Sequence, residues 1–197
     1  MWWRTDITLH VKLETKAKLT YEDYANLPGD DRYELIDGEL ILVPSPSEFH
    51  QAILMNLIHL LQSVRQSGLE RLYCAPFDVI FTDHDVAQPN LLFIAADRAD
   101  IITAANVRGA PDLVVEILSP STSRLDRTRK RELYERHGVK EMWLVDPRER
   151  KLAVLLLRDG KLEDAGEYGT GQALVSETLG NLTIDLDDVF QGKLARG

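Results

Sequence analysis

Residues 113–118 read Leu-Val-Val-Glu-Ile-Leu, a run that is apolar on both faces of an extended chain apart from Glu116. Such a run is typical of a central strand that is covered on both sides. A carboxylate there is costly to bury unless it is paired, protonated or bound to a metal ion. Glu116 is therefore the first candidate for a functional residue. A salt bridge to an arginine, or a place at the solvent-exposed end of the strand, is the structural alternative.

A helix is predicted directly after this strand, over residues 125–137. Asp126, Lys130 and Tyr134 are spaced four apart and therefore share one face of that helix. Six basic and three acidic residues lie between positions 124 and 136, so the segment carries a net charge of +3. It is a candidate surface for the phosphates of a nucleic acid, and a solvated helix with internal ion pairs is the alternative. The candidate contacts are Arg124, Arg127, Lys130 and Arg131.

The rest of the chain alternates between strand and helix patterns. A hairpin is predicted over residues 33–43, because Asp37-Gly38 supplies the positive φ values of a type I′ turn. A long helix is predicted between Ser47 and Gly68. Further strands are predicted at 72–81, 87–94, 112–118, 141–145, 151–157 and 181–186. With no repeat and no flexible linker, this order predicts one α/β domain with a mixed sheet flanked by helices.

Residues 7–13 alternate between apolar and polar side chains, which is the pattern of a half-buried strand. We therefore expect an N-terminal β arm over residues 1–18, a main domain over 19–190 and a C-terminal tail over 191–197. The arm has two interpretations. It pairs with a sheet edge of its own chain, or it extends the sheet of a second subunit in a homo-oligomer, most simply a dimer.

Composition restricts the classes of function. The chain has 197 residues, of which 44% are hydrophobic and 28% charged, as in globular proteins. No apolar run approaches the roughly 20 residues of a membrane-spanning helix, and no secretory signal is recognisable, so we expect a cytoplasmic protein. The net charge of −9 opposes binding of nucleic acid except through a local basic patch or a metal ion. The single cysteine and the histidine spacing argue against zinc.

Two further polar residues are candidates on neighbouring elements. Glu39 follows the Asp-Gly turn of the predicted hairpin, and His50 lies in the first turn of the long helix. For Glu39 the alternative is a solvent-facing strand residue. For His50 it is a hydrogen bond to the preceding loop.

Seven motifs, taken in order, resemble the Uma-two family of bacterial proteins, which is assigned to the PD-(D/E)XK restriction-endonuclease-like superfamily. They are Leu-Thr-Tyr-Glu-Asp-Tyr (19–24), Tyr-Glu-Leu-Ile-Asp-Gly-Glu (33–39), Pro-Ser-Pro-Ser-x-x-His (44–50), Gln-Pro-Asn-Leu-Leu-Phe (88–93), Ala-Pro-Asp-Leu-Val-Val-Glu-Ile-Leu-Ser-Pro-Ser-Thr (110–122), Asp-x-x-x-Lys with Tyr (126, 130, 134) and Glu-x-Trp-Leu-Val-Asp-Pro (141–147). The resemblance covers residues 19–190. It implies a mixed sheet flanked by helices and a magnesium-dependent nuclease site that acts on DNA.

The resemblance also implies roles for particular residues. Glu39, Asn90 and Glu116 would hold Mg²⁺ or Mn²⁺, and Lys130 would supply the lysine of the superfamily. In related nucleases that lysine follows the glutamate by two residues, where this chain has Leu118. The resemblance therefore places it on the following helix. The positioning groups that it implies are His50 and Asp126.

Asn90 departs from the family pattern, which has aspartate at this position. An asparagine keeps a carbonyl oxygen but removes a negative charge, so binding of Mg²⁺ should weaken. Asp78 is a better substitute than Asp85, which would face the opposite side of a regular strand. Two hypotheses remain: a weakened or inactive metal-dependent nuclease, natural or engineered, and a non-catalytic module that binds nucleic acid or protein on the same fold.

Overall fold

The computed structural model describes residues 17–29, 31–66, 71–120 and 123–191. The predicted N-terminal arm and C-terminal tail therefore lie almost wholly outside the described residues. The helices are α1 (Tyr21–Ala25), α2 (Glu48–Gln66), the 3₁₀ helix η1 (Ala96–Ile101), α3 (Ser123–Leu125), the π-helical turn η2 (Asp126–Lys130), α4 (Arg131–His137) and α5 (Leu186–Val189). The strands are β1 (Tyr33–Ile36), β2 (Glu39–Leu42), β3 (Arg71–Cys74), β4 (Val79–Thr82), β5 (Asp85–Ala87), β6 (Leu91–Ile94), β7 (Val107–Arg108), β8 (Leu113–Ile117), β9 (Glu141–Asp146), β10 (Lys151–Arg158), β11 (Lys161–Gly169), β12 (Ala173–Ser176) and β13 (Leu182–Asp185).

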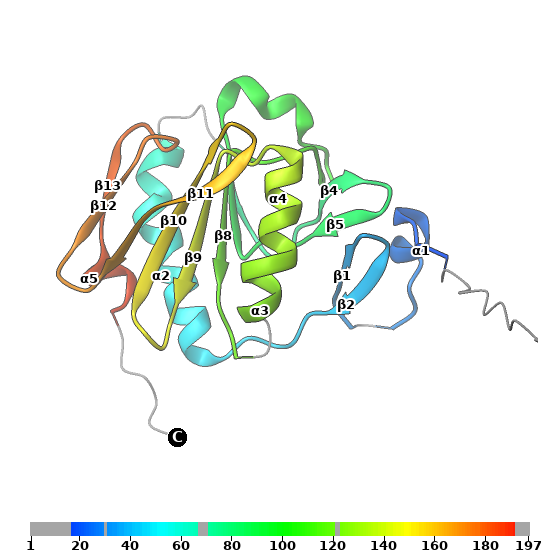
Figure 1. Cartoon of the computed structure of the whole chain (residues 1–197), viewed down its shortest axis with the longest axis horizontal. Helices are drawn as coiled ribbons and strands as arrows, with labels where there is room; N and C mark the ends of the chain where they lie inside the picture. The colour runs from blue at the N-terminus through cyan, green and yellow to red at the C-terminus, as the bar shows by residue number, and fades with distance from the viewer. Residues whose placement is uncertain (1–16, 30, 67–70, 121–122, 192–197) are drawn as a thin grey trace, which may run out of the picture.

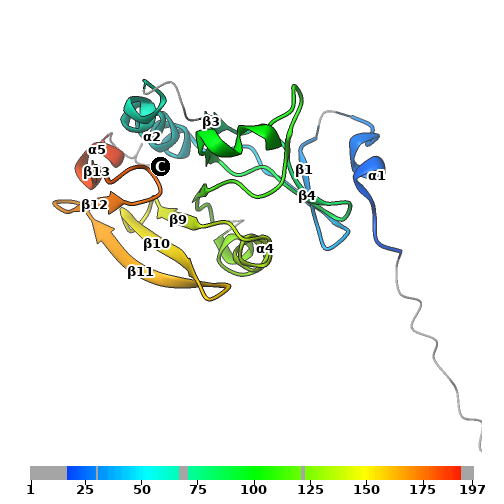
Figure 2. The ribbon, with the colours of Figure 1, turned by 90° about the horizontal axis from the view of Figure 1, so that it is seen from above.

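Within the described residues, a six-stranded sheet in the order β11-β10-β9-β8-β6-β3 forms the centre of the molecule. The pair β8 and β9 is parallel and the other pairs are antiparallel, so the sheet is mixed as predicted. Helix α2 covers one face of this sheet and α4 covers the other (Figures 1 and 2). A five-stranded sheet in the order β2-β1-β5-β4-β7 lies beside it, next to α1 (Figure 1).

Strand β8 shows why the chain folds in three layers. Leu113, Val115 and Ile117 belong to the core cluster formed with α2, because alternate side chains point to the same face. Val114 belongs to the opposite cluster, which includes Leu133 and Tyr134 of α4. Glu116 has the parity of Val114 and therefore faces the helix, so the fold delivers this carboxylate to the layer between β8 and α4.

The β1–β2 hairpin confirms the prediction from Asp37-Gly38. Both turn residues have positive φ, 54° for Asp37 and 76° for Gly38. Ile36 pairs with Glu39 across the turn, and Gly38 accepts a hydrogen bond from the backbone N–H of Leu19 at 3.0 Å. The turn thereby holds the chain that leads into α1.

Gly38→Ala should destabilise the protein at this turn. A Cβ at Gly38 would lie 2.5 Å from the Cβ of Lys18, and alanine disfavours the positive φ. We expect the free energy of unfolding to fall by about 1–3 kcal/mol. Gly160→Ala is the matched control for urea denaturation, because Gly160 has φ +78° but no atom within 4 Å of the added Cβ. If the free energy of unfolding falls equally in the two variants, the contact with Lys18 does not add to the destabilisation, contrary to our expectation.

Several parts of the fold differ from the sequence prediction. The segment predicted as one strand over 87–94 contains the end of β5 and the whole of β6, which belong to different sheets, and η1, β7 and β12 were not predicted. The segment predicted as one strand over 72–81 is two strands, β3 and β4, which belong to different sheets. Pro76 lies between them and lacks the N–H that a continuous ladder needs. Strand β11 was not predicted, because its charged and glycine-rich sequence has neither apolar alternation nor high strand propensity. It forms because β10 supplies a long antiparallel partner.

None of the helices that the structure describes is both long enough and apolar enough to cross a membrane.

Candidate active site

Lys130 lies at the centre of a buried group of carboxylates. Its Nζ atom is 2.8 Å from Glu116 Oε1 and 3.0 Å from Glu34 Oε1. Asp126 Oδ1 lies farther away, at 3.7 Å. Glu34, Glu116 and Lys130 are only 3%, 2% and 4% exposed. These four residues are called the acidic cluster below.

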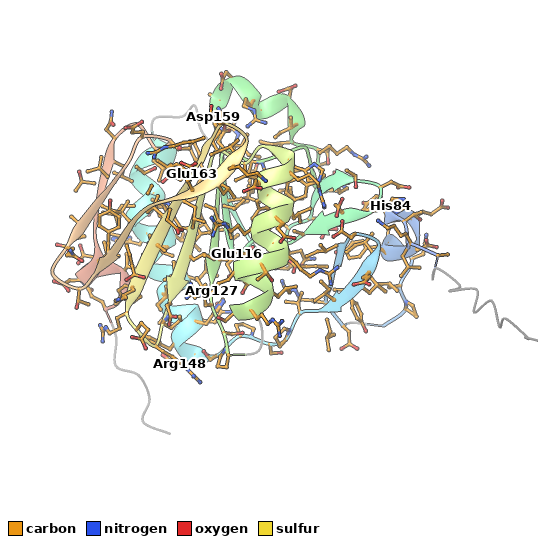
Figure 3. All side chains as sticks on the ribbon, viewed as in Figure 1. His84, Glu116, Arg127, Arg148, Asp159 and Glu163 are labelled. Carbon is orange, nitrogen blue, oxygen red and sulfur yellow. The ribbon has the colours of Figure 1, made fainter. Side chains whose placement is uncertain are left out.

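Three elements bring the acidic cluster together. Glu34 comes from β1, Glu116 from β8, and Asp126 and Lys130 from η2. In a regular α-helix, residues four apart drift by about 40° around the axis, and residues eight apart by about 80°. A π-helical turn is wider, so η2 offsets this drift. Asp126, Lys130 and Tyr134 thus stay on the side of the helix that faces β8. Figure 3 shows Glu116 beside this helix, in the middle of the molecule.

Further hydrogen bonds fix the two glutamates. The hydroxyl of Tyr134 donates to Glu116 Oε1 at 2.5 Å, and the backbone N–H of Gln88 donates to Glu34 Oε1 at 2.7 Å. Each carboxylate therefore has one oxygen held by Lys130 and a second donor. The other oxygen, Oε2, takes part in none of these contacts.

The electrostatics of the acidic cluster follow from three acids around one ammonium. Burial raises the pKa of Glu116, and the Asp126 and Glu34 carboxylates raise it further, against the opposing effect of Lys130. Burial alone would lower the pKa of Lys130, but Glu116, Glu34 and Asp126 outweigh it, and the pKa lies above its usual value. Lys130 is therefore a permanent cation. The raised pKa of Glu116 means that its carboxyl group holds a proton more readily than an exposed glutamate does.

A small pocket opens onto the acidic cluster, with a volume of about 90 Å³. Several of its polar lining residues are buried, and its rim is formed by the exposed residues Leu42, Pro44, Ser45 and Pro46. The polar lining residues are Glu34, His50, Gln88, Asn90, Glu116, Asp126 and Lys130. The structure thus brings together Asn90, Glu116, Lys130, His50 and Asp126, all of which were predicted.

Asn90 and His50 line the same pocket as Lys130. Asn90 Oδ1 accepts a hydrogen bond from the backbone N–H of Ile117 at 2.7 Å. The imidazole of His50 lies against Asn90, and its buried Nδ1 has no hydrogen-bond partner. Burial lowers the pKa of His50, so the ring is neutral at pH 7. His50 and Asn90 therefore add polar groups but no charge to the lining of the pocket.

Glu39 does not line the pocket, unlike Asn90 and Glu116, with which the family resemblance groups it. Its side chain is 70% exposed and forms an ion pair with Arg129 at 2.9 Å. Glu34 takes the expected place, five residues earlier on the other strand of the hairpin. Glu34 could have been found from the sequence, because it stands among Tyr33, Leu35 and Ile36 as Glu116 stands among the apolar residues of its strand.

Asp78 and Asp85 do not replace the missing carboxylate at Asn90. Asp78 Oδ1 accepts hydrogen bonds from the Tyr24 hydroxyl and from Gln88 Nε2, both at 2.8 Å, so it reaches the pocket only through Gln88. Asp85 lies in a separate cluster, where its carboxylate contacts Arg136 at 3.2 Å. Neither residue lines the pocket.

The predicted basic surface is only partly as expected. Lys130 is buried in the acidic cluster and does not reach the surface. Arg127, near the lower end of the helix in Figure 3, pairs with Asp146 at 3.3 Å. Arg131 donates to the carbonyl of Leu162 at 2.5 Å, and Arg124 is exposed.

The chemistry of the donors decides whether a metal ion suits this pocket. Among the described residues, no three His, Cys, Asp or Glu side chains form a group that could hold one alone. Lys130 contacts Glu34 and Glu116, and Asn90 lines the same pocket without adding a charge. The pocket nevertheless offers carboxylate oxygens of Glu34 and Glu116 and the amide oxygen of Asn90. Oxygen donors of this kind fit Mg²⁺ or Mn²⁺.

Comparison with known proteins agrees with this geometry. The family model Uma2, described as "Putative restriction endonuclease", matches residues 21–187. The crystal structure of "a putative nuclease belonging to DUF820" from Anabaena variabilis ATCC 29413 is similar over 87% of this chain and 97% of that chain, with a TM-score of 0.71 and 24% sequence identity. The likeness to this crystal structure confirms the predicted mixed-sheet fold, and the family model agrees with a restriction-endonuclease-like core. No curated protein matches the chain.

Proposed function

Because this chain belongs to the Uma2 family of restriction-endonuclease-like proteins, we propose that it hydrolyses phosphodiester bonds of DNA with a divalent metal ion, Mg²⁺ or Mn²⁺. The observation that carries the proposal is the acidic cluster at the bottom of the pocket. A structural core gains little from three acids and a lysine in one buried place, because desolvation offsets much of their attraction. Such an arrangement is common at functional sites.

Each polar residue has a role in this proposal. Glu34, Glu116 and Asn90 would hold the metal ion, and the chemistry it would supply is Lewis-acid activation of the phosphate and of water. Lys130 stays charged and stabilises the negative charge that develops on the phosphate. Tyr134 and Gln88 hold the two glutamates in position, and His50 and Asp126 orient Asn90 and Lys130.

Asn90 should lower the affinity of the site for a metal ion. Compared with aspartate it removes one negative charge, and its oxygen already accepts the Ile117 N–H. Hard cations draw much of their affinity from ligand charge. We therefore expect weak metal binding and slow cleavage in this chain.

The same observation supports a second candidate function. If Asn90 has abolished metal binding, the fold would serve as a non-catalytic module that binds nucleic acid or a protein partner. If the chain binds DNA but calorimetry detects no binding of Mn²⁺, the non-catalytic function is favoured.

Glu34→Gln should abolish Mn²⁺-dependent cleavage of DNA, because it removes a charged ligand and one of the ion pairs of Lys130. Glu39→Gln is the matched control, since it makes the same change on the same hairpin but outside the pocket. The measurement is the rate at which purified protein cuts plasmid and single-stranded DNA with Mn²⁺. If Glu34→Gln and Glu39→Gln cut at the same rate, the cleavage comes from elsewhere and the proposal fails.

A further inference from the structure

The charged groups of the acidic cluster lie inside a pocket and not on the open surface. The pocket has a volume of about 90 Å³, and Glu34, Glu116 and Lys130 are almost completely buried. A phosphodiester therefore reaches Glu116 and Lys130 only by entering the pocket, and the backbone on either side of it has to turn away toward the exposed lining residues.

Duplex DNA is poorly suited to such an entry. Its bases are stacked, its backbone is held in a regular helix, and it bends smoothly only over a persistence length of about 150 base pairs. Pro44, Ser45 and Pro46 line the pocket and are exposed, so they would meet the flanking sugars and phosphates first. An unpaired strand rotates about individual backbone bonds, and one phosphate can enter while its neighbours turn away.

The rim of the pocket also offers contacts that suit unpaired bases. Leu42 lines the pocket although its side chain is 56% exposed, and Pro44 and Pro46 lie on the same rim. In a duplex the faces of the bases are hidden by stacking, whereas a single strand presents them to apolar and aromatic side chains. Arg32, whose guanidinium donates to Gln88 Oε1 at 2.8 Å, adds a positive charge at the mouth.

The charge distribution of the protein favours a nucleic acid that is contacted at few phosphates over one that is contacted at many. Duplex binding relies on many phosphate contacts in sequence. Several arginines near the pocket already have acidic partners, since Arg127 pairs with Asp146 and Arg129 with Glu39. The net charge of the chain is −9. A substrate that needs only a few phosphate contacts is therefore favoured.

We propose that the substrate of this pocket is single-stranded DNA, such as an unpaired end, flap or loop, and that Leu42 contacts a base next to the phosphate that enters. This inference rests on the proposed nuclease function for its chemistry, but its binding preference is measurable without any cleavage.

The test measures binding by fluorescence anisotropy, without metal, of an unpaired oligonucleotide and of a duplex with the same number of phosphates. We expect the unpaired strand to bind about tenfold more tightly. Leu42→Ala should weaken that binding severalfold and leave duplex binding unchanged. Met55→Ala is the matched control, because Met55 is 62% exposed but does not line the pocket. Equal or tighter binding of the duplex, or equal effects of the two substitutions, would overturn the inference.

A second readout separates this inference from the proposed function. The Asn90→Asp variant is incubated with Mn²⁺ and a duplex that contains one unpaired segment. Cuts confined to the unpaired segment support the inference, and cuts in the paired regions overturn it. If nothing is cut, the proposed hydrolysis is wrong, while the anisotropy measurement still decides which form of DNA the pocket takes.

Discussion

Lys130→Met should be the most destabilising single change in the site. It removes the ammonium that contacts Glu34 and Glu116 and leaves both carboxyl groups buried beside one another. Loss of one partner from a buried ion pair costs about 3–5 kcal/mol. Methionine preserves the length and apolar character of the side chain, so the loss reports mainly on charge.

The measurement is thermal unfolding at neutral pH, where we expect the melting temperature to fall by about 10 °C. Lys151→Met is the matched control, because Lys151 is exposed and pairs with exposed Glu167. That variant should melt close to the parent protein. Similar melting temperatures for the two variants would contradict the claim that Lys130 stabilises the buried carboxyl groups around it.

Asn90→Asp should strengthen metal binding by at least about 10-fold, because a third carboxylate joins Glu34 and Glu116 at the pocket. The new oxygen still accepts the Ile117 N–H, so the local backbone keeps its hydrogen bond. Isothermal titration with Mn²⁺ measures the change. Asn181→Asp is the control, since it adds the same charge at an exposed turn whose positive φ aspartate tolerates.

An unchanged Mn²⁺ affinity in Asn90→Asp would show that the pocket does not hold the metal. An equal gain in Asn181→Asp would assign the effect to net charge alone. Either result would mean that Asn90 has no role in binding the metal ion. Neither would affect the description of the fold.

Much of the fold was predictable because its signals are local. The Asp37-Gly38 turn, the amphipathic α2 and the apolar β8 each follow from a few neighbouring residues. Strand β11 was missed because its sequence lacks that local signal, and its structure comes from pairing with β10. The division between β3 and β4 was missed because the pattern on either side of Pro76 looks continuous.

Part of the candidate site was also predictable from local sequence patterns. Glu116 stood out as a charge within a buried strand, and Asp126 and Lys130 stood out by helical spacing. The family resemblance implies Glu39, but Glu34 belongs to the same short motif. Only the three-dimensional structure shows which of the two faces Lys130. The sequence also predicts that Lys130 contacts DNA, whereas two of its three acidic neighbours, Glu34 and Glu116, come from strands far from it in the chain.

The most direct test of the metal-dependent nuclease site compares Mn²⁺-dependent DNA cleavage by three proteins: the parent chain, Asn90→Asp, and the double variant Asn90→Asp with Glu116→Ala. We predict that Asn90→Asp cuts faster than the parent and that the added Glu116→Ala change abolishes cleavage. Cleavage that survives the loss of Glu116, or three proteins that neither cut DNA nor bind Mn²⁺, would contradict a nuclease site built from Glu34, Asn90, Glu116 and Lys130.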